Sequence, residues 1–278
     1  MSGFNPSSEH PLLVFGGPYS NLEATTAMRK FAEEQQIPPC NILCTGDLVA
    51  YCASPEETVN LIRDWNISVV LGNCEESIGN DADDCGCGFE EGSSCNLLSV
   101  AWYNYSRPRI GQDNKSWMAD LPSQLRFRFN DIDCLAIHGG INSINQFIFP
   151  STSPDEKQSQ LKQAGTDIII GGHSGIPFGE NTGNGYWLNA GVVGMPANDG
   201  TADTWYMLLT PQNHGIKASW HRLKYDAETC AEKMAAAGLN YGYEKAIISG
   251  LWPSTDILPT TEADTTGSKL ILTPLDIP

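Results

Sequence analysis

The sequence predicts an α/β fold built on parallel strands. Up to residue 73, short apolar runs alternate with amphipathic stretches, and this rhythm implies strands joined by crossover helices. Polar residues also stand directly after several apolar runs, and the carboxyl ends of strands are where open α/β sheets bind ligands. The fold class and the position of a functional site are therefore predicted together.

The first three elements follow from local patterns. Residues 11–15 (PLLVF) form a short apolar run that is typical of a strand. Residues 21–35 carry apolar side chains at the i, i+3, i+4, i+7 spacing of one helix face. Residues 41–47 (NILCTGD) predict a buried strand that ends in a turn.

The next two elements complete a β-α-β-α-β order. Residues 54–65 are expected to be helical, because Ser54 is a typical N-cap, Pro55 suits the first helical position and Glu57 completes a capping box. Residues 67–73 (ISVVLGN) predict a third strand.

The rest of the chain predicts one domain with an appendage. Helices are expected at 95–106, 154–164 and in two segments after 226, and strands at 125–130, 133–140, 167–175, 185–189, 203–209 and 216–223. We expect a domain over residues 1–225 with a Cys-rich acidic insertion at 74–95. Residues 226–278 are expected to form a C-terminal helical extension with an irregular tail.

Composition and charge exclude several classes of protein. The chain is 41% hydrophobic, which suffices for one large core, and it has no apolar stretch long enough to span a membrane. Its start lacks the pattern of a signal peptide, so we expect a cytoplasmic protein. With 33 acidic and 16 basic side chains the net charge is −17, which repels nucleic acid and anionic lipid.

Four polar residues follow successive strands, each beside a glycine: Asp47, Asn73, His138 and His173. Glycine lets the backbone turn tightly there, so that the polar side chains can project into one crevice. Carboxylate, amide and imidazole groups together suit Fe, Zn or Mn. One such residue alone is weak evidence, whereas four at successive strand ends predict a metal site.

Five sequence blocks resemble the ordered blocks of calcineurin-like metallophosphoesterases: GDLVAYCASPEE, LGNCE, IHGG, GGHSG and LNAGVVGMP, within residues 11–223. The resemblance implies a four-layer sandwich of two mixed β-sheets flanked by helices, with a two-metal site at the strand ends. It also implies that the metals bind phosphoryl oxygens of a small phosphate ester and activate a hydroxide for in-line attack.

The resemblance carries metal ligands over to particular residues. Asp47 matches the aspartate that bridges both metals, and Asn73, His138 and His173 match three ligands of the second metal. Three ligands of the first metal are absent, since the matching positions hold Gly17, Tyr19 and Gly175. We therefore expect one site for Fe, Zn or Mn rather than two.

Two residues beside these positions are candidate catalytic residues. Cys74 stands where many family members carry a histidine thought to protonate the leaving group, and it could be a general acid, a metal thiolate or a buried thiol. Tyr19 could ligate ferric iron, donate a proton to the substrate, or fill the space of the missing metal.

The insertion gives the spacing C-x10-C-x-C-x7-C from Cys74 through Cys85 and Cys87 to Cys95, with seven acidic and no basic residues between the first and last of these. One interpretation is a solvated acidic loop with reduced thiols. A second is a cluster that binds zinc, iron or copper, whose thiolates replace the lost first-metal ligands. A third is a redox disulfide, either Cys85–Cys87 or Cys87–Cys95.

Three hypotheses for function follow. The chain is a metal-dependent phosphoesterase with a depleted or rebuilt site, a non-hydrolytic scaffold of the same fold, or a metal or redox protein that uses the insertion. The loss of ligands at positions 17, 19 and 175 favours the scaffold. The four ligands of one subsite that are kept favour the enzyme.

Overall fold

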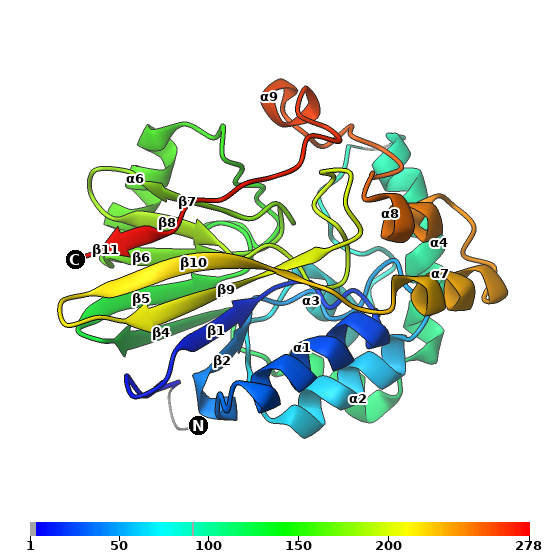
Figure 1. Cartoon of the computed structure of the whole chain (residues 1–278). Helices are drawn as coiled ribbons and strands as arrows, with labels where there is room; N and C mark the ends of the chain where they lie inside the picture. Colours follow the sequence, from blue (N-terminus) through cyan, green and yellow to red (C-terminus); the bar gives the residue numbers. More distant parts are fainter. Residues whose placement is uncertain (1–3, 91) are drawn as a thin grey trace.

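The computed structural model describes residues 4–90 and 92–278, whose strands form two mixed sheets (Figure 1). The first sheet contains, in spatial order, β11 (Leu275–Ile277), β10 (Ile216–Leu223), β9 (Thr204–Pro211), β1 (Leu12–Phe15), β2 (Ile42–Cys44) and β3 (Ser68–Val69). The second contains β4 (Gln124–Phe129), β5 (Ile132–Ile137), β6 (Ile168–Gly171), β8 (Tyr186–Asn189) and β7 (Phe178–Asn181).

Parallel strands form one side of the first sheet and the middle of the second. In the first sheet β1, β2 and β3 are parallel, as predicted, and β9 pairs antiparallel with β1. In the second sheet β5, β6 and β8 are parallel, whereas β4 and β7 are antiparallel to their neighbours. The β4–β5 hairpin turns at Asn130 and Asp131, whose φ values of 47° and 68° are typical of a type I′ turn.

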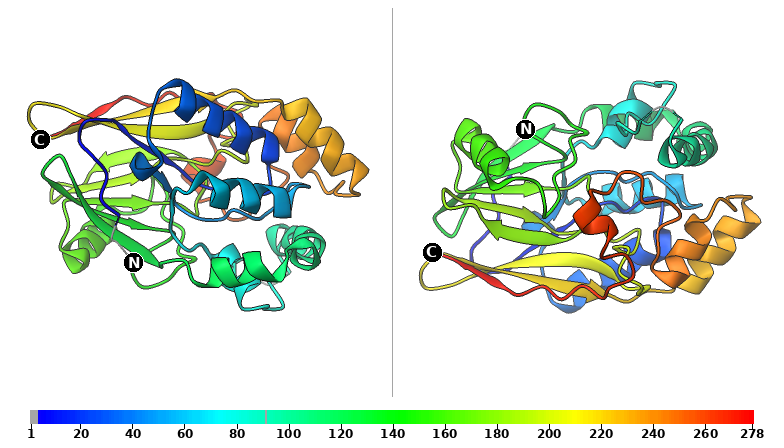
Figure 2. Two further views of the ribbon diagram at one scale, coloured as in Figure 1. Left: turned by 90° about the horizontal axis from the view of Figure 1, so that it is seen from below. Right: turned by 90° about the horizontal axis from the view of Figure 1, so that it is seen from above.

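The layers follow from the alternation of side chains along each strand. Leu12 and Val14 of β1 point into the core between the sheets, whereas Leu13 and Phe15 point to the helices outside. Helices α1 (Leu22–Glu34) and α2 (Pro55–Trp65) cover the first sheet, and α6 (Pro154–Ala164) covers the second (Figures 1 and 2). The four-layer sandwich that the resemblance implied is confirmed.

The C-terminal region packs onto this domain. Helices α7 (Ala227–Ala236) and α8 (Tyr243–Ser249) share a core with α1, into which they bury Met234 and Ile247. After the short helix α9 (Thr260–Ala263), β11 adds an edge strand to β10. The tail is mostly irregular, and it ends in this strand with Ile277 buried between the sheets.

Several elements differ from the prediction. Helices α3 (Asn73–Gly79) and α5 (Gln112–Ala119) and strand β7 were not expected, and α3 takes up the first part of the predicted insertion. The remaining elements are α4 (Ser94–Ser106) and the short 3-10 helices Pro39–Asn41 and Arg107–Arg109. Helix α2 begins at Pro55 as predicted, but the Ser54 side chain makes no capping hydrogen bond, so the expected capping box is wrong. Within the described residues, no helix has the length and apolar character needed to cross a bilayer.

Candidate metal centre

The structure brings the four predicted strand-end ligands together. Asp47 follows β2, Asn73 begins α3, His138 follows β5 and His173 follows β6. His138 Nε2 lies 3.3 Å from Asp47 Oδ2, 3.1 Å from Asn73 Oδ1 and 3.1 Å from His173 Nδ1. All four side chains are buried.

A backbone carbonyl fixes the tautomer of His138. Its Nδ1 lies 2.6 Å from the carbonyl oxygen of Thr45, so Nδ1–H donates to that oxygen and Nε2 points into the cluster. Nε2 therefore faces a carboxylate oxygen, an amide oxygen and a nitrogen of a second imidazole. This donor set suits Fe, Zn or Mn.

The close approach of two turns requires glycine. A Cβ on Gly46 would lie 2.8 Å from the backbone nitrogen of Gly72, and a Cβ on Gly72 would lie 2.6 Å from Asp47 Oδ1. The turns are also strained, because the backbones of Asp47 and His173 are left-handed, with φ values of 60° and 54°. Such strain, which costs about 1–3 kcal/mol per residue, is concentrated at functional sites.

Glu75 holds the two turns of the centre together, and the sequence did not reveal it as a site residue. Its buried carboxylate accepts the backbone N–H groups of Asp47 at 2.7 Å, Leu48 at 2.6 Å and Gly72 at 3.0 Å. It thereby connects the loop after β2 with the start of α3. The available signal was its place in the block LGNCE, two residues after Asn73.

The pKa values of Asp47 and His138 are shifted toward an ion pair, since burial lowers the pKa of His138 but the charge of Asp47 outweighs burial and raises it. Burial raises the pKa of Asp47, but attraction to His138 outweighs it and lowers the pKa to about 2. Burial and the neighbouring His138 lower the pKa of His173 to about 3. Burial and the charge of Asp47 raise the pKa of Glu75 to about 7. At neutral pH the centre thus holds an ionised carboxylate beside a neutral imidazole.

Tyr19 occupies the region of the missing first-metal ligands. A Cβ on Gly17 would lie 2.6 Å from Tyr19 Cζ, so a side chain at position 17 cannot coexist with this ring. A Cβ on Gly175 would lie 4.0 Å from the Tyr19 hydroxyl oxygen. The buried ring therefore lies between two positions that the family uses for ligands. Burial, together with the charge of Asp47, raises the pKa of Tyr19 well above its usual value, so it is a neutral phenol.

A cavity of about 50 Å³ opens beside the centre. Its polar lining includes Asp47, His173 and Tyr19, and its apolar lining includes Phe147 and Trp252. None of the described residues that line it is Lys or Arg. Burial and the charge of Asp47 raise the pKa of Cys74, which also lines the cavity, well above its usual value.

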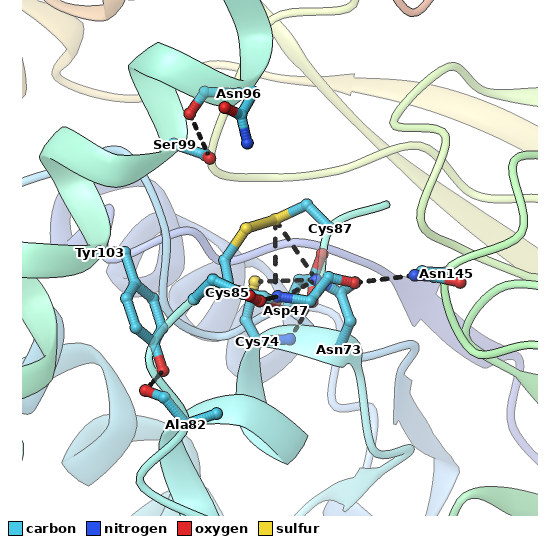
Figure 3. Close-up of a disulfide and its surroundings, with 12 residues drawn as sticks. Asp47, Asn73, Cys74, Ala82, Cys85, Cys87, Asn96, Ser99, Tyr103 and Asn145 are labelled. Atoms are coloured by element: carbon cyan, nitrogen blue, oxygen red, sulfur yellow. Dashed lines mark hydrogen bonds between the residues drawn. A yellow bond between two sulfur atoms is a disulfide. The ribbon is translucent and has the colours of Figure 1, made fainter. Parts of the chain in front are cut away.

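Two insertion cysteines are joined to each other. Cys85 and Cys87 form a disulfide directly beside Asn73, one of the pairings that the redox interpretation expected (Figure 3). The Asn73 amide donates to the Cys85 carbonyl oxygen at 2.9 Å, so its Nδ2 points to the loop and its Oδ1 to His138. Cys95 is a free thiol that lines the same cavity as Cys87. Metal binding by these three cysteines stays a prediction.

Comparison with known proteins agrees with this architecture. The family model described as calcineurin-like phosphoesterase matches residues 12–206. The chain belongs to the calcineurin-like phosphoesterase family. The match spans the strands and turns that position the metal centre, and it ends in β9.

Relatives of the chain match it over most of its length. An uncharacterised protein of Methanocaldococcus jannaschii is 27% identical over 241 residues, which cover 80% of this chain and 91% of that protein. A hypothetical protein of Pyrococcus horikoshii superposes with a TM-score of 0.74 at 17% identity, over 86% of this chain and 98% of that one. A metallophosphoesterase of Sphaerobacter thermophilus superposes with a TM-score of 0.68 at 19% identity, over 87% of this chain and 99% of that one. Both structures share the calcineurin-like phosphoesterase fold with this chain.

Proposed function

We propose that this calcineurin-like phosphoesterase hydrolyses a small phosphate ester with one metal ion, held by Asp47, Asn73, His138 and His173. The observation that carries the proposal is the convergence of three lone-pair atoms within 3.3 Å of His138 Nε2. The four side chains together form a donor set that suits a transition-metal ion.

The number of metal ions follows from the position of Tyr19. The ring fills the space beside Gly17, and neither Gly17 nor Gly175 has a side chain to coordinate a second ion. In the disulfide-bonded chain Asp47 therefore serves one Fe, Zn or Mn ion.

When bound, the metal supplies Lewis-acid charge to the phosphoryl group and lowers the pKa of a water molecule. The residues of the chain supply the rest. The Tyr19 phenol lines the cavity and donates a proton to the leaving oxygen, with the Cys74 thiol as a second donor on the same wall. The aromatic walls exclude bulk water, which strengthens each polar interaction inside.

The absence of Lys and Arg from the described lining limits the charge of the substrate. A phosphomonoester carries about two negative charges at neutral pH, by analogy with protein phosphates, and a diester carries one less. A site whose positive charge comes from one metal ion is better matched to the diester. We therefore propose a small phosphodiester as the substrate class.

Metal content and turnover test this proposal. The protein is purified without chelators, its metal content is measured, and hydrolysis of bis(p-nitrophenyl) phosphate is compared with that of p-nitrophenyl phosphate under Mn²⁺, Fe²⁺ and Zn²⁺. We expect one bound metal and a preference for the diester. His138→Ala should lose both metal and activity, whereas His214→Ala, at an exposed histidine outside the centre, should keep both.

A non-hydrolytic scaffold is the second candidate, favoured by the loss of three first-metal ligands to Gly17, Tyr19 and Gly175. It predicts a folded wild-type protein without turnover. A metal-free, fully folded wild type that stays metal-free after incubation with all three metals would overturn the enzyme proposal.

We also propose a cytoplasmic location, which the free thiols support. Seven cysteines are unpaired, and six of these are buried. In oxidising compartments cysteines are usually paired, and a disulfide in a reducing compartment is usually redox-active.

A further inference from the structure

The Cys85–Cys87 disulfide lies between two cavities. The inner cavity, beside the metal centre, is lined by Cys87 and Phe89. An outer cleft of about 350 Å³ is lined by the same two residues and also by Cys85. The short loop that carries the disulfide thus lines both cavities.

The inner sulfur is close to groups of the centre. The Asn73 amide nitrogen lies 3.5 Å from Cys87 Sγ and 3.5 Å from Cys74 Sγ, so both sulfurs contact one side chain (Figure 3). The Cys74 backbone N–H donates to Asp47 Oδ1 at 3.3 Å. Cys74 and Cys87 also line the inner cavity together with Asp47 and Tyr19. Two sulfurs and a carboxylate therefore line one cavity beside the centre.

The outer cleft gives access to the other half of the disulfide. Cys85 lines this cleft, as do the carboxylate-bearing Asp83 and Asp84, which attract a divalent cation. A dithiol reductant that enters the cleft attacks Cys85 Sγ, and the Cys85–Cys87 bond breaks with Cys87 leaving as a thiolate. The second thiol of the reductant then displaces Cys85, so that the reductant is oxidised to a disulfide and the chain gains two thiols.

We propose that reduction of Cys85–Cys87 creates a second metal site, in which Cys74 and Cys87 bind a thiophilic divalent cation such as Zn²⁺ beside Asp47. In the oxidised chain Cys87 has no thiolate to offer. In the reduced chain the cation displaces the protons of the two thiols and is held by two sulfurs and a carboxylate oxygen, a donor set that suits zinc. Cys85 is the redox partner of Cys87 and not a ligand.

The proposal rests on the proposed function only because Asp47 is a metal ligand in both sites. Its consequence is a chain that changes from one metal to two with the redox state of the insertion. The two sulfurs then supply metal ligands that Gly17 and Tyr19 do not supply.

Metal stoichiometry tests this site without an activity measurement. Zn²⁺ per chain is measured after equilibration and gel filtration, with and without the phosphine reductant TCEP, which is not a dithiol that competes for zinc. The oxidised wild type should hold one Zn²⁺ and the reduced wild type a second. With Co²⁺ as the probe, the second equivalent should add a sulfur-to-metal charge-transfer band in the near ultraviolet.

Two matched variants separate the roles of the two cysteines. Cys85→Ser leaves Cys87 free and should bind the second Zn²⁺ without any reductant. Cys87→Ser should stay at one Zn²⁺ under both conditions, and Cys40→Ser, at an exposed free cysteine, should behave as the wild type. Circular dichroism checks that each variant is folded.

A reduced wild type and a Cys85→Ser variant that both stay at one Zn²⁺ overturn the thiolate site and leave the proposed function standing. An oxidised wild type that holds no metal contradicts the proposed function instead. Equal Zn²⁺ uptake by Cys85→Ser and Cys87→Ser would also overturn the proposal, since of these two cysteines only Cys87 is assigned as a ligand.

Discussion

The carboxylate of Glu75 shows how one residue can position a centre that it does not enter. It accepts three backbone N–H groups from the two turns that carry Asp47 and Asn73. Replacing it leaves those groups buried without an acceptor, and such losses cost about 1–3 kcal/mol each.

We expect Glu75→Gln to weaken metal binding by about 10–100-fold, because groups that orient ligands have effects of this size. The amide offers one acceptor oxygen where the carboxylate offers two. Metal titration measures the affinity, and Glu76→Gln, at the exposed neighbour on α3, is the control. Equal affinities of the two variants would show that Glu75 does not position the centre.

The hydroxyl of Tyr19 can be tested separately from its ring. Tyr19→Phe keeps the ring beside Gly17 and removes the proposed proton donor, so we expect kcat to fall by about 10²–10⁴-fold with metal content unchanged. Steady-state kinetics and metal analysis measure the two quantities. An unchanged kcat would assign Tyr19 to space filling only.

Single residues at the site were predictable where a block of sequence carried them. Asp47, Asn73, His138 and His173 each stand beside a glycine after an apolar run, and the structure brings all four together. The role of Thr45 was not predictable, because it acts through a backbone carbonyl that any residue could offer.

At the scale of elements, long periodic segments were predictable and short ones were not. Helices α1, α2 and α6 begin and end within a residue or two of their predicted bounds. Helix α3 has seven residues and begins at a metal-site residue, so its sequence predicts a turn. It begins at this position because the Glu75 carboxylate accepts the backbone N–H of Gly72.

One buried carboxylate helps to attach the C-terminal tail to the domain. Asp199 accepts hydrogen bonds from the Arg222 side chain, from Thr201 Oγ1 at 2.8 Å and from the Leu270 backbone at 3.1 Å. Burial raises its pKa, but these hydrogen bonds outweigh burial, so the pKa lies below its usual value. A carboxyl group with a lowered pKa stabilises the fold at any pH above its unfolded value of about 3.9.

We therefore expect Asp199→Asn to lose about 1–3 kcal/mol of unfolding free energy at neutral pH. The difference from the wild type should shrink as pH falls through the folded-state pKa, because protonation then removes the same charge from the wild type. Urea unfolding at several pH values measures this difference in unfolding free energy, with Asp264→Asn at an exposed carboxylate as control. A pH-independent difference would contradict this account.

At the scale of the whole molecule, the two mixed sheets came from the family resemblance and not from periodicity. Local patterns indicated the parallel order of β1, β2 and β3 but not the partner strands of β9 or β7, since pairing between distant segments depends on the packed core. The pairing of the disulfide was also undecided, because sequence alone does not choose between Cys85–Cys87 and Cys87–Cys95.

The net charge of −17 governs the long-range behaviour of the molecule. We expect no retention of duplex DNA or single-stranded RNA at low salt, because binding to these polymers depends on basic groups that neutralise phosphates. A gel-shift assay tests this expectation, with a basic DNA-binding protein as positive control. Salt-sensitive retention would reveal a basic surface that the overall charge conceals.

Trp252 gives the metal centre an optical reporter. Its indole N–H donates to the Pro196 carbonyl oxygen at 2.6 Å, and its ring lies 3.7 Å from the place of a Cβ on Gly175. Because this indole lines the cavity, a paramagnetic ion such as Co²⁺ bound there should quench its fluorescence. The quenching should vanish in Trp252→Phe, and filling of the centre then becomes visible in real time without any substrate.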